Sequence, residues 1–180
     1  MLRSVASRVL NFLAPTRKFR VMLIGLEGAG KTTLMYHVFV KETLTTIPTL
    51  SVNTEIMKYG NSLLTVRDFG GNEQCQNSWC TYLDEIFQII VVVVDATNEK
   101  RLDDAKKSIH RVLNDNRVRD CRVLIFANKQ DQPTAMDNAT ISDRLALCDI
   151  PQRRWKIQGC SAINGSGLDE GLSWCIKQGC

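Results

Sequence analysis

The sequence contains no apolar stretch long enough to cross a membrane. Its longest uninterrupted apolar run covers residues 89–94, whereas a transmembrane helix needs about 20 apolar residues in succession. Terminal lipidation motifs are absent too: Leu2 occupies the position of the glycine that N-myristoylation requires, and Gly179-Cys180 is not a prenylation signal. These absences exclude a membrane-spanning helix and predict that neither lipid anchors the chain.

The sequence also lacks a secretory signal and any cluster of metal ligands. Its seven cysteines occur singly, and the closest cysteine pairs have neither metal-ligand spacing nor a histidine nearby. We therefore expect reduced thiols in a cytosolic protein and no zinc site. The formal charge of +4 is too small to indicate nucleic acid, and we expect no such partner.

What is present fits one α/β domain. β-rich runs predict strands at residues 19–24, 52–58, 63–69, 87–94, 122–127 and 154–159. Helical spacing of apolar residues predicts helices at residues 33–39, 75–86, 102–113, 141–147 and 168–176. This alternation predicts a mostly parallel six-stranded sheet between two helical layers, and a hairpin turn at Gly60-Asn61 sets one antiparallel edge strand.

One glycine-rich stretch organises this domain. Residues 25–32 have the pattern G-x-x-x-x-G-K-T and stand between a buried strand and a helix. The glycines allow backbone N–H groups to turn toward an anion. Lys31 supplies a positive charge for the β- and γ-phosphates, and the Thr32 hydroxyl can ligate Mg²⁺. Strand, glycine loop and helix N-terminus together predict a site for the phosphate chain of a nucleotide.

A second motif predicts which base is bound. Residues 128–131 are Asn-Lys-Gln-Asp and directly follow a strand. The Asp131 carboxylate only accepts hydrogen bonds, so it suits the N1–H and N2–H₂ of guanine, a donor pair that adenine lacks. Asn128 can contact the base edge and hold the loop, the stem of Lys129 can lie over the ring, and the N–H of Ala162 can meet guanine O6.

Further residues predict that the site detects the γ-phosphate. Asp68 ends a strand and can hold Mg²⁺ through a water. Gly71 can offer its N–H to the γ-phosphate, and the Thr49 hydroxyl can reach Mg²⁺ only when that phosphate is present. Two segments that both need the γ-phosphate predict a switch, ordered with GTP and released after hydrolysis.

These motifs, in this order, resemble those of small GTPases. Glu27, the Ile-Pro-Thr of residues 47–49 and the amphipathic N-terminal segment resemble the ADP-ribosylation-factor-like (Arf/Arl) group, and the resemblance covers essentially the whole chain. It implies the three-layer P-loop GTPase fold, bound GTP or GDP with Mg²⁺, and a cycle controlled by an exchange factor, a GTPase-activating protein and effectors in membrane traffic or organelle organisation.

The resemblance also implies the residues of the site. The catalytic set is Asn72, Gly71, Lys31 and Thr49, and the Mg²⁺ set is Thr32, Thr49 and, through water, Asp68. Nucleotide contacts are implied for Glu27, Gly28, Ala29, Gly30, Lys31, Thr32, Thr33, Gly71, Asn128, Lys129, Asp131, Ser161 and Ala162.

The sequence departs from this family at the residue that orients the attacking water. Asn72 follows Gly71 where most members have Gln, and its amide falls about 1.5 Å short because one methylene is missing. Displacements of this size cost on the order of 100-fold in rate, so we expect slow intrinsic GTP hydrolysis. The alternative is a GTP-binding scaffold that scarcely hydrolyses. An ATP-dependent enzyme is disfavoured by Asp131.

Other departures concern partners. The positions of the family's aromatic effector patch hold Val52, Arg67 and Tyr82, so we expect a different effector preference, unless Arg67 simply solvates an exposed strand face. Ser51 replaces a glycine at the start of the segment between the two switches, and it could restrict the register shift of that segment.

The N-terminal segment has its own pattern. Residues 2–13 place apolar side chains on one side of a helix and Arg3 and Arg8 on the other, and Pro15 ends the pattern. We expect a helix over residues 1–15 ahead of a GTP-binding domain over residues 16–180. The helix can lie in a membrane interface or pack on the domain, and both alternatives stay open. We expect a cytoplasmic monomer that associates reversibly with the Golgi or another endomembrane.

Overall fold

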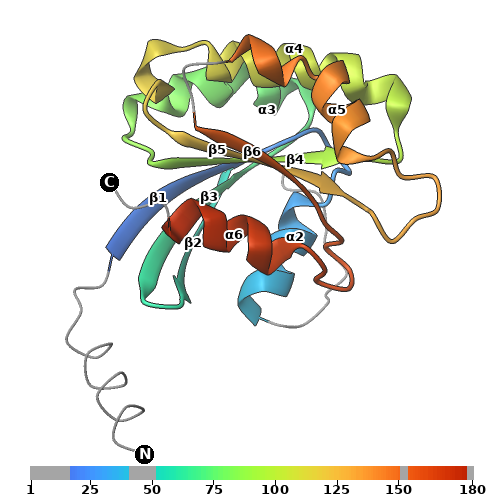
Figure 1. Cartoon of the computed structure of the whole chain (residues 1–180). Helices are drawn as coiled ribbons and strands as arrows, with labels where there is room; N and C mark the ends of the chain where they lie inside the picture. The colour runs from blue at the N-terminus through green and yellow to red at the C-terminus, as the bar shows by residue number, and fades with distance from the viewer. Residues whose placement is uncertain (1–16, 41–51, 151–153, 178–180) are drawn as a thin grey trace, which may run out of the picture.

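A six-stranded sheet forms the middle layer of the domain (Figure 1). The computed structural model describes residues 17–40, 52–150 and 154–177. The strand order is β2-β3-β1-β4-β5-β6, and every neighbouring pair is parallel except the β2–β3 hairpin at one edge. The predicted fold class is confirmed. The strands are β1 (Arg17–Ile24), β2 (Val52–Tyr59), β3 (Ser62–Phe69), β4 (Ile89–Asp95), β5 (Arg122–Asn128) and β6 (Trp155–Gly159).

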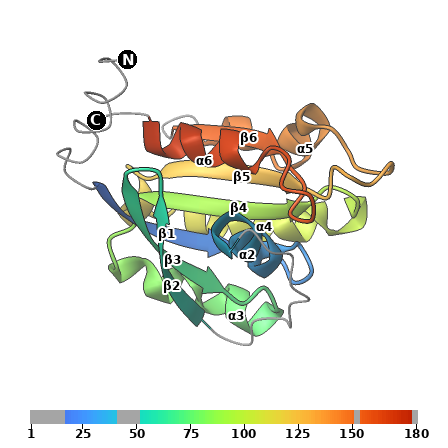
Figure 2. The ribbon, with the colours of Figure 1, turned by 90° about the horizontal axis from the view of Figure 1, so that it is seen from below.

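Helices cover both faces of this sheet. Figure 1 shows α3 (Glu73–Ser78), α4 (Leu102–Leu113) and α5 (Asn138–Arg144) on one face. The other face carries α2 (Lys31–Val40) and α6 (Leu168–Lys177), which lie in front of the sheet in Figure 2. Short 3₁₀ turns connect several elements, at Trp79–Asp84, Glu99–Arg101, Asn116–Val118 and Leu147–Asp149. Within the described ranges, no helix has the length and apolar character needed to cross a bilayer.

The parallel register brings polar residues to one edge of the sheet. Residues 89–94 of β4 are buried on both faces, which is why this strand has no polar alternation. Leu23 pairs with Asp68 across β1 and β3, and Asp95 pairs with Asn128 across β4 and β5. The carboxyl ends of these strands therefore lie together, where ligands of open α/β sheets bind.

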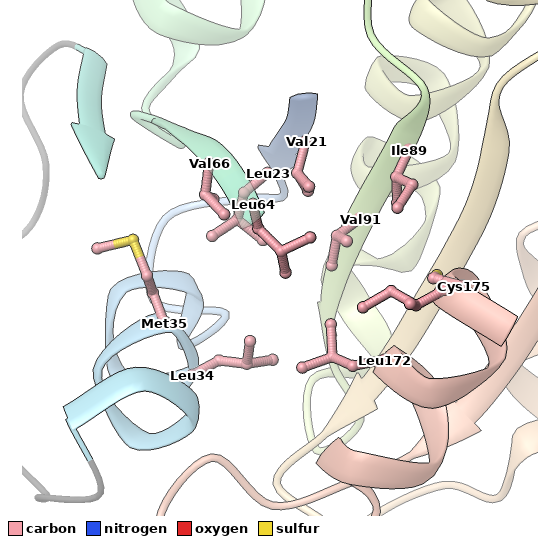
Figure 3. A pocket seen from close by; sticks show the side chains of 11 residues that line it. Val21, Leu23, Leu34, Met35, Leu64, Val66, Ile89, Val91, Leu172 and Cys175 are labelled. Atoms are coloured by element: carbon pink, nitrogen blue, oxygen red, sulfur yellow. The ribbon is translucent and has the colours of Figure 1, made fainter. Parts of the chain in front are cut away.

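The layer formed by α2 and α6 is not perfectly filled. A cavity of about 20 Å³ lies between these helices and the sheet, and only apolar side chains line it. Figure 3 shows Leu34 and Leu172 pointing toward one another from the two helices, with side chains of β1, β3 and β4 around the space between them. The lining residues are Val21, Leu23, Leu34, Met35, Leu64, Val66, Ile89, Val91, Leu172, Cys175 and Ile176.

The segment predicted as one helix over residues 75–86 is divided in the structure. Helix α3 starts earlier, because the Asn72 side chain caps it, and ends at Ser78; a 3₁₀ turn follows. At this junction Ser78 Oγ donates to Cys75 O at 2.9 Å and Thr81 Oγ1 donates to Ser78 O at 2.6 Å. Such local side-chain bonds compete with regular helix bonds, which explains the change. The predicted N-terminal helix, Thr49 and Ser51 lie outside the described residues.

Candidate functional site

The glycine-rich loop after β1 has the geometry that its glycines predict. Gly28 and Gly30 have φ angles of +78° and +95°, in the left-handed region that favours glycine. A Cβ atom on Gly30 would lie 2.4 Å from Asn128 Nδ2, and one on Gly25 would lie 2.2 Å from Val93 O. The loop therefore packs so closely on β4 and β5 that a side chain at Gly25 or Gly30 would collide with them.

Lys31 lies inside this loop at the start of α2. Its side chain is buried, and Nζ donates to Gly25 O at 2.9 Å and to Leu26 O at 3.1 Å. Burial lowers the pKa of Lys31, although the carboxylates of Asp68 and Glu27 oppose the shift. An ammonium group inside a loop at a helix N-terminus forms an anion-binding site.

Thr32 and Asp68 form the expected oxygen pair. Thr32 Oγ1 donates to Asp68 Oδ2 at 2.8 Å, and Asp68 is fully buried. Hydroxyl and carboxylate oxygens are the hard donors that Mg²⁺ prefers. In the part of the chain that the structure describes, no group of three or more His, Cys, Asp or Glu side chains could hold a metal.

Asn128 joins three segments on the other side of the loop. Its Nδ2 donates to Ala29 O at 2.8 Å, and its Oδ1 accepts from Ala162 N at 2.8 Å. Both ends of the amide are therefore engaged with the protein. The Ala162 N–H, which is predicted to meet guanine O6, donates to Asn128 in this structure.

The Lys129 ammonium pairs with a carboxylate from the neighbouring strand. Lys129 has a φ of +71°, and its Nζ donates to Asp95 Oδ2 at 2.6 Å. Burial opposes ionisation of Asp95, but hydrogen bonds from Lys129 and Thr97 outweigh it and lower the pKa of this carboxyl. The pair holds the stem of Lys129 at the base end of the site.

Asp131 is exposed at the mouth of the same region. A hydrogen bond with the Ser161 side chain is the main cause that lowers the pKa of Asp131, so the carboxylate stays ionised and acceptor-only. Asp131 lines a cavity of about 450 Å³, large enough for a nucleoside. The predicted residues Gly28, Gly30, Thr33, Asn128, Lys129 and Ala162 line it with Asp131.

Several residues of the site were not predicted from the sequence. Thr97, Gln132, Thr134 and Ile163 also line the cavity. Thr97 closely follows the carboxyl end of β4, which meets the ends of the neighbouring strands at one edge, so its place near the site was predictable. Arg101 donates from Nη1 to Glu27 O at 2.7 Å and so contacts the glycine-rich loop from a turn 74 residues away, a separation at which no local pattern gives a signal.

The predicted catalytic segment lies against the glycine-rich loop. Gly71 O accepts from Glu27 N at 2.9 Å, and a Cβ atom on Gly71 would lie 2.4 Å from Glu27 N. Asn72 follows in extended conformation, and its Oδ1 accepts from Cys75 N at 2.8 Å as the N-cap of α3. The structure thus places Gly71 against the glycine-rich loop, and the Asn72 side chain caps helix α3.

Comparisons with known proteins agree with this site. The family model described as "ADP-ribosylation factor family" matches residues 6–179. Among solved structures, the chain is similar to the Arl6 (BBS3) small GTPase of Trypanosoma brucei bound to the nucleotide analogue GppNp. The TM-score is 0.82 at 28% sequence identity, covering 89% of this chain and 96% of that one. The chain therefore belongs to the ADP-ribosylation factor (Arf) family of small GTPases.

Proposed function

We propose that this GTP-binding switch of the Arf family hydrolyses GTP slowly on its own, because Asn72 caps helix α3. The observation that supports this proposal most directly is the 2.8 Å hydrogen bond from Cys75 N to Asn72 Oδ1. To reach an attacking water, the amide would have to leave the cap, which costs about 1 kcal/mol. It would still be one methylene shorter than the usual Gln, so both effects act against hydrolysis.

The remaining chemistry of the site is intact in this proposal. Lys31 carries the positive charge for the β- and γ-phosphates, and Gly71 packs beside it. Thr32 and Asp68 would hold Mg²⁺ through their oxygens, and the ion would offset the charge of the phosphate chain. The proposed defect therefore concerns the water-orienting group and leaves nucleotide binding unchanged.

Single-turnover hydrolysis of GTP by the full chain with Mg²⁺ tests this proposal. We expect Asn72→Gln to raise the rate about 10-fold to 100-fold. Asn77→Gln, the same change elsewhere on α3, is the control and should leave the rate unchanged. Equal rates for wild type and Asn72→Gln would contradict the proposal. If the wild-type protein hydrolyses no GTP even with an extract that contains GTPase-activating proteins, the result would favour the alternative function, a GTP-binding scaffold.

We further propose that effector binding uses the surface of Val52, Arg67 and Tyr82. Arg67 forms an ion pair with Glu85, and its guanidinium lies 5.5 Å from the centre of the Tyr82 ring. With 23% of its side chain exposed, Arg67 is mostly occupied by these contacts, which supports a role beyond solvating the strand face. A charged, paired group supports a preference for effectors other than those that bind an aromatic patch. Pull-down with an Arf-type effector domain should show stronger binding after Arg67→Trp.

We also propose that the protein acts as a monomer in the cytoplasm and associates reversibly with endomembranes through residues 1–15, in membrane traffic or organelle organisation. The support is the apolar stripe of these residues and the basic side chains of Arg3 and Arg8.

A further inference from the structure

Two consecutive backbone carbonyls beside the phosphate loop are each held by a side chain further along the chain. Trp79 Nε1 donates to Gly70 O at 3.0 Å, and Gln76 Nε2 donates to Gly71 O at 2.7 Å. In a planar trans peptide, the C=O and the N–H point in opposite directions. Trp79 therefore sets the direction of the Gly71 N–H. Gln76 sets the direction of the Asn72 N–H together with the Glu27 N–H, which also donates to Gly71 O at 2.9 Å.

The orientation of the Gln76 amide is itself determined by its neighbours. A carbonyl oxygen only accepts, so the amide nitrogen of Gln76 must face Gly71 O. The amide oxygen then faces α4, where it accepts from Ser108 Oγ at 2.6 Å. Ser108 is buried in the contact between α3 and α4. The hydroxyl of Ser108 thus holds the donor end of Gln76 against Gly71.

These peptides lie at the γ-phosphate end of the loop. A Cβ atom on Gly71 would lie 2.5 Å from Gly25 O, and the same Gly25 oxygen accepts from the Lys31 ammonium at 2.9 Å. The ammonium group that serves the β- and γ-phosphates is therefore next to the peptides that Gln76 and Trp79 hold. Rotation of either peptide would change which N–H groups a γ-phosphate meets.

We propose that Gln76, oriented by Ser108, is a positioning residue that sets the preference of the site for GTP over GDP. The inference rests on the function proposed above, since it concerns the same switch. Gln76 acts through the Gly71–Asn72 peptide, whose carbonyl it holds beside the Glu27 N–H. GDP has no γ-phosphate, so loss of this contact should weaken the binding of GTP much more than that of GDP.

Dissociation rates of two fluorescent nucleotides from the full chain with Mg²⁺ test the proposal, one a diphosphate and one a non-hydrolysable triphosphate. Gln76→Glu replaces the donor with a carboxylate that repels Gly71 O, and we expect the triphosphate to leave about tenfold faster while the diphosphate rate changes less than about twofold. Ser108→Ala should shift the same ratio by a smaller factor. When Ser108→Ala is combined with Gln76→Glu, the ratio of the two dissociation rates should equal that of Gln76→Glu alone, because Ser108 acts through Gln76.

Gln74→Glu is the matched control, because Gln74 is exposed on the same helix and undergoes the same chemical change. Equal acceleration for both nucleotides, an unchanged ratio, or the same effect from Gln74→Glu would each overturn the proposal. Should Gln76→Glu fail to fold, the ratio measured for Ser108→Ala decides. A wild-type protein that binds neither nucleotide would overturn the proposed function and this inference together, whereas normal wild-type binding with an unchanged ratio in the variants overturns this inference alone.

Discussion

At the scale of single residues, side chains of the site divide into those that face a nucleotide and those that hold the loops. Asn128 is a holding residue, because Ala29 and Ala162 occupy both ends of its amide. Asp131 is exposed and keeps its carboxylate ionised through Ser161. Discrimination between bases should therefore depend on Asp131. The position of the base pocket should depend on Asn128.

Asp131→Asn tests this division. An amide cannot accept from both donors of guanine, so we expect the affinity for GTP to fall on the order of 100-fold or more. Affinity for xanthosine triphosphate should rise, because its C2 oxygen accepts from the new NH₂ group. Competition titrations measure both changes, with Asp143→Asn, an exposed position on α5, as the control for lost charge. A variant that keeps wild-type GTP affinity would show that another residue reads the base.

The pKa of Asp131 also predicts how the wild type responds to acid. Because this pKa is lowered from its usual value of about 3.9, the carboxylate that is predicted to pair with guanine persists below the pH at which an ordinary Asp titrates. The contribution of Asp131 to affinity is thus fully present at neutral pH and is lost only as the pH falls through the lowered pKa.

At the scale of elements, the helical layers fit the sheet unequally. The α4 side buries Leu102, Ile109, Val112 and Leu113 almost completely. The α2–α6 side leaves the apolar cavity that Cys175 lines (Figure 3). Burial raises the pKa of the Cys175 thiol to about 12, so this residue remains neutral and packs as a small apolar group.

Cys175→Val should therefore stabilise the protein. The added methyl group fills part of the cavity, for a gain of about 1 kcal/mol, and the helix propensities of Cys and Val are similar. The free energy of unfolding from denaturant titrations at saturating nucleotide measures the change. Cys121→Val is the matched control: the Cys121 thiol donates to Phe87 O at 3.0 Å, so the same substitution there should destabilise. Loss of stability at residue 175 would show that the cavity cannot accept a branched side chain.

At the scale of the whole molecule, the parallel register converts four separate motifs into one site. Residues from the ends of β1, β3, β4 and β5 meet although they are distant in sequence, as the pairing of Leu23 with Asp68 and of Asp95 with Asn128 shows. If residues 1–15 form the predicted helix, its apolar stripe would be covered either by lipid or by protein.

Flotation with anionic liposomes distinguishes binding of the N-terminal segment to lipid from its packing on the protein. If the proposed membrane association is correct, the full chain floats, and more of it floats with a non-hydrolysable GTP analogue than with GDP. Removal of residues 1–14 or substitution of Arg3 and Arg8 by Glu should abolish flotation, because apolar area and positive charge both contribute. Flotation that is equally absent for the full chain in both nucleotide states would favour packing of the helix on the protein.

Much of the fold could be predicted because its signals are local. The buried run of residues 89–94 and the glycines of residues 25–30 are typical of a central strand and a phosphate loop, whatever surrounds them. The divided helix after Asn72 could not be predicted from apolar spacing, because hydroxyl groups at Ser78 and Thr81 compete for its carbonyls. Apolar spacing reports which face is buried, and it does not report such polar bonds.

The sequence by itself determined the family and the α/β alternation, because motifs and apolar patterns are read from residues close together in the chain. It also predicted which groups could hold phosphate, Mg²⁺ and guanine, although Thr32 and Asp68 meet across 36 residues only in the folded chain. The Asn72 cap is also local, since its Oδ1 accepts from Cys75 N three residues further on, and Asn is a preferred N-cap residue. Only the tertiary structure decided what Gln76 contacts, because its bond with Ser108 spans 32 residues. Hydrogen bonds are directional and depend on where two segments meet, so the contacts of Gln76 follow from how α3 packs between the glycine-rich loop and α4.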